Sequence, residues 1–358
     1  MTEPGAALDH VRDQVGQVLG EFVGRQRTLA TEVAGELRAA IDATADVLAG
    51  GKRLRAAFCY WGWRGAGGGD DPAIFAAAAA LELLHAGALV HDDVLDDSDT
   101  RRGRPTIHRR FAAQHEAAGW RGAAAPFGQG IAVLLGDLLL TWTDELFHGS
   151  GLPDTALRRG RAVLDLMRTE LMAGQYLDLL EQAAGPGSVA DALRVVTYKT
   201  AKYTIERPLH LGATLAGPQE AHPGLGGAYT GYGLPLGVAF QLRDDVLGVF
   251  GDPAETGKPA GDDIREGKRT VLVAIAREKA TRQQAAELGR MLGDRSIDAA
   301  GVAAFRQLLA ETGALAECEA MIDRYVTEAL AALDEAPMTA AAKAALAELA
   351  ITATARTR

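Results

Sequence analysis

The sequence predicts an all-α fold, built as a single-domain helical bundle. Alanine, leucine, glutamate and arginine dominate the chain, and these residues have high helix propensity. No stretch alternates apolar and polar residues with the two-residue period of a half-buried strand. No fixed-period repeat, low-complexity linker or change of composition divides the 358 residues. Helices at this density, joined by short loops, are typical of one bundle whose apolar faces share a core.

The first part of the chain contains three segments that are expected to lie outside regular helices. We expect residues 1–20 to form a frayed N-terminal segment, and residues 21–358 to form the all-α domain. Glycine is frequent in residues 65–71 and 119–130. We interpret both of these segments as connections between helices, because glycine weakens a helix.

A long helix is expected to begin at Pro72. Asp71 precedes this proline, and an aspartate followed by proline is typical of an N-cap and first helical position. The apolar residues 76–84 continue the helix toward Asp97.

Later boundaries rest on glycine, proline and serine. Residues 185–188 read Gly-Pro-Gly-Ser and are expected to end one helix. Ser188, with Asp191 three residues later, predicts a capping box for the next helix. Pro208 and Pro235 lie inside apolar helical patterns and are expected to bend them.

Composition excludes several classes of protein. The 37 Lys and Arg residues are outnumbered by 47 Asp and Glu, so a nucleic-acid-binding protein is not expected. Cys59 and Cys318 are too few for a disulfide framework or a zinc site and fit reduced thiols. The N-terminus shows no secretory signal. The apolar stretch 131–140 is interrupted by Gly136 and Asp137 and is too short to span a bilayer. We therefore expect a soluble, cytoplasmic protein.

The strongest local signal is the acidic run His91-Asp92-Asp93-Val94-Leu95-Asp96-Asp97 at the end of the long helix. Asp92 and Asp96 share a helix face, where carboxylates repel one another, and negative charge is unfavourable near a helix C-terminus. A bound cation would offset both costs, and oxygen ligands favour Mg²⁺ or Mn²⁺ over zinc. A solvated acidic helix end is the alternative interpretation of this run alone.

A second acidic pair strengthens the metal hypothesis. Asp244 and Asp245 end another apolar helix, after Phe240-Gln241 and before Gly251-Asp252. Two carboxylate pairs facing each other across a cavity would hold metal ions that present positive charge to a phosphate-bearing ligand. Lysines and arginines stand close to these pairs, at 52–55, 101–102, 199, 258 and 268. Neither glycine segment near them matches the phosphate loop GxxxxGK[ST], so a nucleotide kinase is not expected.

With these motifs in family order, the chain resembles the trans-type isoprenyl diphosphate synthases, the polyprenyl synthetase family, and is most similar to bacterial geranylgeranyl diphosphate synthases. The segments that carry the resemblance are GGKRLR at 50–55, LLHAGALVHDDVLDDSDTRRGRPTIH at 83–108, GQYLD at 174–178, KTA at 199–201 and FQLRDDVLGVFGDPAETGKPAGDDIREGKRT at 240–270. They cover most of residues 50–275.

The resemblance implies a helical bundle with a central apolar cavity, a homodimer and a magnesium-dependent prenyltransferase. The reaction it implies joins isopentenyl diphosphate head-to-tail to an allylic diphosphate: dimethylallyl, geranyl or farnesyl diphosphate. In the family mechanism the allylic diphosphate ionises, the cation alkylates the alkene, and the released pyrophosphate accepts the proton. A closed, apolar cavity protects the cation from water.

The resemblance also implies roles for individual residues. The expected metal ligands are Asp92, Asp96, Asp244 and Asp245, and the expected catalytic set adds Asp93 and Lys199. The residues that match contacts to the allylic diphosphate are Arg101, Lys199, Thr200, Gln241, Lys258 and Lys268. The residues that match the isopentenyl diphosphate site are Lys52, Arg55, His85 and Arg102. Gln175 and Asp178 match positions that line the same cavity.

Three positions depart from the family pattern or need a separate interpretation. Gly248 stands where many members carry a third aspartate, so the second metal site rests on Asp244 and Asp245, with Asp252 as an outer contact. Ala56 replaces a usual proline, with little expected effect. His91 is expected to be a structural hydrogen-bonding residue.

The length of the product is expected to depend on the helix that carries the first acidic motif. In this family the growing tail extends toward the N-terminus of that helix. Gly87 and Ala88 are too small to stop it at farnesyl length, and Leu84 and Leu81 lie roughly 12 and 16 Å behind Asp92. The expected product is therefore geranylgeranyl diphosphate, with farnesyl or longer polyprenyl diphosphates as alternatives.

Two other functions remain as alternatives. A class I terpene cyclase also ionises an allylic diphosphate, but an Asn/Ser/Glu metal triad would be expected in place of FQLRDD. A non-catalytic subunit of a synthase would be expected to lose its metal carboxylates, whereas both aspartate pairs are present.

Overall fold

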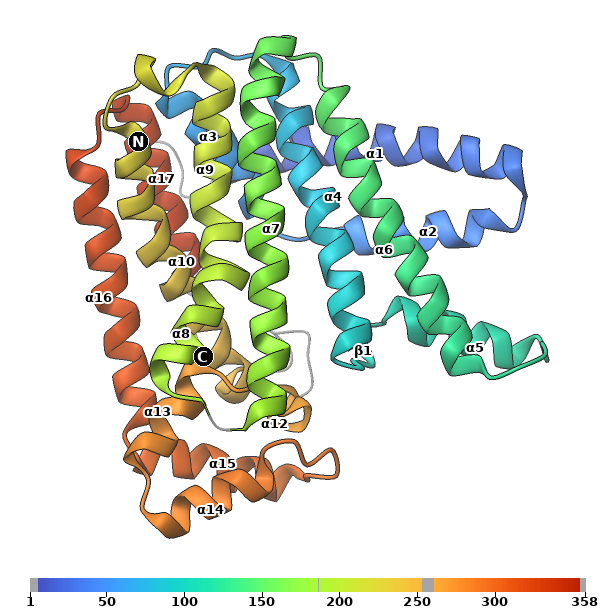
Figure 1. Cartoon of the computed structure of the whole chain (residues 1–358), viewed down its shortest axis with the longest axis vertical. Coiled ribbons are helices and arrows are strands. Elements are labelled where there is room, and N and C mark those ends of the chain that lie inside the picture. Colours follow the sequence, from blue (N-terminus) through green and yellow to red (C-terminus); the bar gives the residue numbers. More distant parts are fainter. Residues whose placement is uncertain (1–5, 186, 253–260, 355–358) are drawn as a thin grey trace.

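The prediction of an all-α protein is confirmed by the computed structural model, which describes residues 6–185, 187–252 and 261–354 (Figure 1). In chain order its elements are α1 (Ala6–Val33), α2 (Leu37–Leu48), α3 (Leu54–Gly65), α4 (Pro72–Leu95), β1 (Thr100–Arg101), β2 (Arg104–Pro105), α5 (Ile107–Ala117), α6 (Ala124–His148), α7 (Asp154–Ala184), α8 (Val189–Val195), η1 (Val196–Glu206), α9 (Arg207–Ala216), η2 (Gln219–Ala221), α10 (Leu225–Phe250), α12 (Asp262–Glu266), α13 (Val271–Lys279), α14 (Arg282–Met291), α15 (Ala299–Glu311), α16 (Ala314–Glu335) and α17 (Ala340–Thr354). The strands β1 and β2 pair as a short antiparallel hairpin directly after α4.

Two apolar cores meet along α10. The larger core contains side chains of α1, α3, α4, α6, α7, α9 and α17. The smaller core contains side chains of α8, α13, α14, α15 and α16. Helix α10 contributes side chains to both cores. Tyr232 and Leu236 are buried in the larger core, and Leu242 and Val246 are buried in the smaller core. Long helices run nearly side by side through the middle of the molecule, and α12 to α15 gather at one end (Figure 1).

The helix that carries the first acidic motif begins as predicted. Asp71 caps α4, and its side chain accepts a hydrogen bond from the backbone N–H of Ala73 at 2.9 Å. Pro72 is the first residue of the helix. The predicted capping box of α8 is also confirmed, because Ser188 and Asp191 exchange side-chain and backbone hydrogen bonds. The capping rules therefore located both helix starts from local sequence alone.

Two predicted boundaries were wrong. Residues 6–20 are not frayed: α1 begins at Ala6, and Val11, Val15 and Leu19 are buried in the larger core. The apolar stripe on this helix is stabilised by tertiary packing that its position at the N-terminus did not reveal. Residues 124–130 are not a connection, because α6 already begins at Ala124.

A wide π-helical segment, η1, is a feature that sequence reasoning missed. It covers Val196–Glu206 and passes directly into α9, so Pro208, the second residue of α9, lies where the helix changes from π to α geometry. Neighbouring helices approach its backbone closely: a Cβ on Gly174 of α7 would lie 2.4 Å from the Lys199 nitrogen, and one on Gly237 of α10 would lie 2.4 Å from Ala201 Cα. π-Helical turns are rare and occur frequently at functional sites.

Among the described residues, two helices are long and apolar enough to cross a membrane by length and composition alone. In Pro72–Leu95 the most apolar window is 72% buried inside the protein, and in Ala124–His148 the corresponding window is 28% buried. The buried α4 is a core helix, which passes the same test of length and composition.

Candidate active site

A cavity of about 510 Å³ lies between α3, α4, α7, η1 and α10. Its apolar wall includes Ala88, Leu89, Leu171 and Phe240, while acidic and basic side chains line the rest. The wall draws on both cores, since Leu171 belongs to the larger and Val196 to the smaller. Many of the residues that the sequence predicted as site residues therefore face one space.

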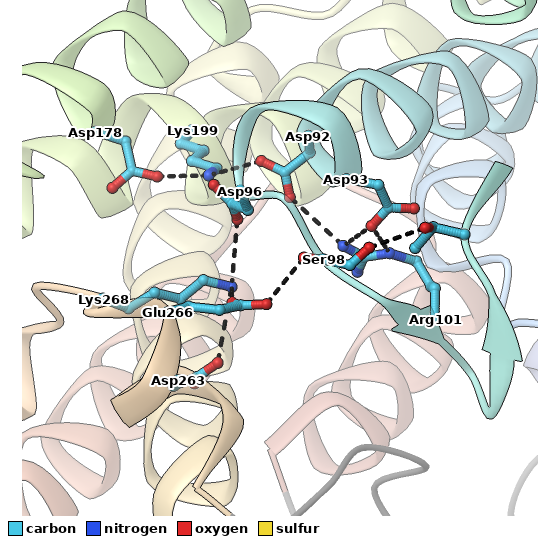
Figure 2. A network of polar contacts seen from close by, with 11 residues as sticks. Asp92, Asp93, Asp96, Ser98, Arg101, Asp178, Lys199, Asp263, Glu266 and Lys268 are labelled. Carbon is cyan, nitrogen blue, oxygen red and sulfur yellow. Dashed lines mark hydrogen bonds and ion pairs between the residues drawn. The ribbon is translucent and has the colours of Figure 1, made fainter. Parts of the chain in front are cut away.

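The first acidic wall is formed at the end of α4. Asp92 lines the cavity, and its carboxylate accepts a hydrogen bond from Lys199 Nζ at 3.2 Å. The same ammonium group donates to Asp178 of α7 at 2.6 Å, so Lys199 bridges two helices (Figure 2). Burial is the largest single influence on Asp92 and opposes its ionisation, but the charges of Lys199, Lys268 and Arg101 together outweigh burial and lower the pKa of this carboxyl group.

Asp96 lies one turn beyond Asp92 and is almost fully buried. Its side chain is 3% exposed, and its carboxylate lies 3.6 Å from Lys268 Nζ. Burial, together with the charge of Asp92, raises its pKa to about 6. A carboxylate pair of this kind gains free energy from an additional cation, as the sequence argument expected.

Asp93 does not lie at the cavity, where its predicted catalytic role would require it to be. It is buried and is not among the residues that line the cavity. Its carboxylate accepts a hydrogen bond from Arg101 Nε at 2.6 Å, while Arg101 Nη2 lies 3.7 Å from Asp92 (Figure 2). On an α-helix, Asp93 points about 100° away from Asp92. Asp93 therefore orients Arg101 toward the cavity instead of facing it.

The second acidic wall is formed by α10. Asp244 and Asp245 both line the cavity, and Asp245 accepts a hydrogen bond from Gln241 Nε2 at 2.8 Å. Burial raises the pKa of Asp245 to about 8. Gln241 in turn accepts a hydrogen bond from Thr200 of η1 at 2.7 Å. The predicted polar residues of η1 and α10 thus form one connected row.

A second group of cations lies at another part of the cavity wall. Arg55 donates to Thr204 at 2.8 Å and lies over the ring of Tyr203, 4.3 Å from its centroid. His85 faces the same Tyr203 ring. Burial, followed by the charge of Arg55, lowers the pKa of His85, so this ring is neutral. The structure therefore brings together the Arg55 and His85 that the sequence assigned to isopentenyl diphosphate.

The remaining two residues of that predicted site also line the cavity. Arg102 donates to the carbonyl oxygen of Ala49 at 3.3 Å, and Lys52 donates to that of Thr352 in α17 at 3.3 Å. The carbonyl partner of Arg102 carries no full charge, so this guanidinium group can also bind an anion in the cavity.

The predicted floor residues separate in the structure. Ala88 lines the cavity, whereas Gly87 faces α6, where a Cβ on it would lie 3.0 Å from the Gly136 carbonyl oxygen and 3.1 Å from Leu140. Leu84 and Leu81 are fully buried one and two turns further along α4. Of the two small residues proposed to leave room for the tail, Ala88 is the one in contact with the cavity.

Three other sequence predictions have different outcomes. Lys258 lies outside the described residues. Asp252 is described and exposed at the end of α10. His91 is confirmed as a structural residue, because its ring nitrogen Nε2 lies 3.1 Å from the carbonyl oxygen of Val133 in α6.

The two acidic walls fit a divalent ion that is shared with a ligand. Within the described ranges, no three Asp, Glu, His or Cys side chains already converge on one metal position. Lys199 and Lys268 instead lie between the carboxylates. The donors are all oxygen, and Asp96 Oδ2 is buried without a hydrogen-bond partner. Mg²⁺ typically binds one or two carboxylates and takes its other ligands from water and phosphate, which matches this arrangement.

Sequence reasoning missed several residues of the site. Glu82 is buried in α4, accepts a hydrogen bond from the Ala56 backbone N–H at 3.2 Å, and lies 3.4 Å from Arg53. Glu266 lies 2.8 Å from Lys268, and Ser98 donates to it at 2.8 Å. Glu82 stands three residues before His85 in an otherwise apolar run, and this isolated charge was a signal that could have identified it.

Comparisons with known proteins agree with this geometry. The model of the polyprenyl synthetase family matches residues 37–309. The chain is 32% identical to a geranylgeranyl diphosphate synthase of Mycobacterium tuberculosis, over 92% of this chain and 89% of that protein. It is also 32% identical to a geranylfarnesyl diphosphate synthase of Aeropyrum pernix, over 81% of this chain and 85% of that protein.

A solved structure is similar over nearly the whole length. It is the geranylgeranyl pyrophosphate synthase of Corynebacterium glutamicum, complexed with isoprenyl diphosphate and magnesium. The two proteins are 40% identical, with a TM-score of 0.90, and the match covers 99% of this chain and 100% of that one. Together with the facing aspartate pairs and the two groups of cations, these matches show that the chain belongs to the polyprenyl synthetase family.

Proposed function

We propose that the protein is a trans-prenyltransferase that condenses isopentenyl diphosphate with an allylic diphosphate, with geranylgeranyl diphosphate as the main product. The observation that carries this proposal is the arrangement of one cavity. It has two acidic walls, with Lys199 paired to Asp92 and Lys268 close to Asp96, and a separate group of Arg55, His85 and Arg102. One half suits a metal-bound diphosphate and the other half suits a second, metal-free diphosphate.

The acidic half would bind and ionise the allylic substrate. Asp92, Asp96, Asp244 and Asp245 would hold Mg²⁺, which would supply positive charge to stabilise pyrophosphate as a leaving group. Arg101 and Lys199 point at the same region and would contact oxygens of this diphosphate, as charge-assisted donors do. Their carboxylate partners hold them in place before the substrate arrives.

The second half would hold isopentenyl diphosphate with its alkene toward the allylic cation. Arg55, Arg102 and Lys52 supply fixed positive charge, and the neutral His85 supplies a hydrogen-bonding ring. The apolar side chains of Leu89, Leu171 and Phe240 exclude water from the path between the two substrates. The base that completes the reaction is the released pyrophosphate, so the chain itself needs none.

The experiment that tests this function is a radiolabelled product assay. Purified protein is incubated with Mg²⁺, isopentenyl diphosphate and dimethylallyl, geranyl or farnesyl diphosphate. The expected result is geranylgeranyl diphosphate from each primer, and no product without isopentenyl diphosphate or after chelation of the metal. Release of hydrocarbon in the absence of isopentenyl diphosphate would identify a cyclase, and absence of any product would identify a non-catalytic subunit.

Product length offers a direct test of the cavity floor. Ala88 is the small residue on α4 that lines the cavity, so Ala88→Phe is expected to shorten the main product to farnesyl diphosphate. Thin-layer chromatography of dephosphorylated products measures the change. Leu84→Ala, which enlarges the space one turn deeper, is expected to add longer products. An unchanged product from Ala88→Phe would contradict the assignment of this residue to the floor.

We also propose that the protein is a cytoplasmic homodimer. Large apolar side chains are exposed on α6 and α7, with Leu134 65% and Tyr176 66% exposed. A second copy of the chain would cover such a surface, since soluble monomers rarely leave apolar patches of this kind open. Leu134→Glu is expected to produce monomers by light scattering after gel filtration, whereas Val33→Glu, at a similarly exposed site on α1, is expected to remain dimeric. A dimeric Leu134→Glu variant would contradict this placement of the interface.

A further inference from the structure

The departure at Gly248 has a structural counterpart in α12. Gly248 lies one turn beyond Asp244 on α10, where the family pattern places a third aspartate. A Cβ atom on Gly248 would lie 1.8 Å from Asp263 Oδ2 and 2.7 Å from Asp263 Cγ. The carboxylate of Asp263 therefore occupies the space into which a side chain at position 248 would project.

Asp263 is directed toward the acidic site. The residue is 9% exposed, and its Oδ1 atom lies 3.7 Å from Lys268 Nζ. The same ammonium group lies 3.6 Å from Asp96 of the first wall, so Lys268 stands between Asp96 and Asp263 (Figure 2). A cation thus already links Asp263 to a predicted metal ligand across the site.

The position of Asp263 relative to the second wall follows from Gly248, which lies one turn beyond Asp244 on the same helix. Asp252, which the sequence suggested as the additional carboxylate, is exposed instead.

From this geometry we propose that Asp263 supplies the third carboxylate of the second acidic wall, in the space that Gly248 leaves open, and helps to hold the divalent ion there. The proposal rests on the proposed function for the identity of the ion. It explains why glycine is compatible with a metal site at position 248: the side chain that completes the wall comes from α12 rather than from α10.

An exchange of the two positions tests this placement. Asp263→Ala removes the carboxylate. Gly248→Asp introduces one where Asp263 already stands, so this variant alone is expected to unfold at a lower temperature. The double variant Gly248→Asp/Asp263→Ala removes the two Asp263 atoms that obstruct position 248, which are Cγ and Oδ2. All other atoms of residue 263 lie at least 3.4 Å from a Cβ atom at position 248. Gly248→Ala/Asp263→Ala has the same backbone changes without any carboxylate and is the matched control.

The readout is binding of Mg²⁺ with inorganic pyrophosphate, measured by calorimetry and by the shift of melting temperature. Asp263→Ala is expected to raise the Mg²⁺ concentration required for half-saturation about tenfold. The aspartate double variant is expected to recover most of that loss, and the alanine double variant none of it. Asp262→Ala, on the same helix turn, is expected to bind like the unchanged protein. Asp263→Asn keeps the shape of the side chain and is expected to match Asp263→Ala.

The outcomes distinguish this inference from the proposed function. Equal Mg²⁺ binding by Asp263→Ala and the unchanged protein, or equal binding by the two double variants, would overturn the role of Asp263 while leaving the function intact. Failure of the unchanged protein to bind Mg²⁺ with pyrophosphate, together with no prenyl transfer, would instead remove the function on which the inference rests.

Discussion

Asp92→Asn is expected to lower kcat for prenyl transfer by about a thousandfold. Asp92 lines the cavity and faces Lys199 and Arg101, so its carboxylate is the member of the first wall best placed to hold a metal next to the allylic diphosphate. The amide retains the shape of the side chain and removes its charge. The loss should therefore appear in the ionisation step, and it is measured as kcat with saturating farnesyl and isopentenyl diphosphates.

Asp99→Asn is the matched control for this prediction. Asp99 belongs to the loop that follows the acidic run, but its side chain is 80% exposed and pairs with Arg109 at 2.7 Å. The control is expected to retain kcat within about twofold, because an exposed ion pair contributes little to stability. Similar rates for Asp92→Asn and Asp99→Asn would mean that the first wall does not hold the metal.

Lys199→Met is expected to give the second large effect, a loss of about a hundredfold in kcat/KM for the allylic substrate. Its ammonium group lies between Asp92 and Asp178, and burial has not neutralised it, since these two carboxylates raise its pKa. Without this cation the two carboxylates face each other unshielded, and the allylic diphosphate loses a charged donor. The KM for isopentenyl diphosphate is expected to change much less, because that substrate uses Arg55 and Arg102.

A second lysine of the same π-helical segment provides the control. Lys202 points away from the cavity and pairs with Glu170 of α7 at 2.6 Å. Lys202→Met is expected to lower the melting temperature while leaving kcat/KM for both substrates nearly unchanged. If both lysine variants lost activity to the same extent, the effect would come from disruption of η1 and not from the position of Lys199.

Local sequence was sufficient to predict several parts of this protein, because they depend on interactions between residues close together in the chain. Asp71 and Pro72 marked the start of α4 through a cap that spans three residues. The four-residue spacing of Asp92 and Asp96 placed Asp92 at the cavity and Asp96 one turn further on, close to Lys268, which also lines the cavity. The family resemblance assigned one group of residues to the allylic diphosphate and its metal and another to isopentenyl diphosphate, and members of both groups line the same cavity.

Other features depend on contacts between distant segments and could not be read from spacing. Asp93 belongs to the same acidic run as Asp92, yet its rotation on the helix directs it to Arg101. Gly87 and Ala88 are equally small, but the packing of α6 against α4 leaves only Ala88 in the cavity. The burial of Leu8, Val11, Val15 and Leu19 depends on the larger core, which is assembled from helices far apart in sequence.

The sequence by itself determined that the chain is helical, where its carboxylates and cations are grouped, and which chemistry those groups support, because residue type and helical periodicity are local properties. The tertiary structure decided which of these groups share a space. The wide turns of η1 between Gly174 and Gly237 place Lys199 at the first wall, and the docking of α12 puts Asp263 beside Gly248. Such placements follow from the close approach of backbones, which is a property of packing between segments and is not encoded in the spacing of any one motif.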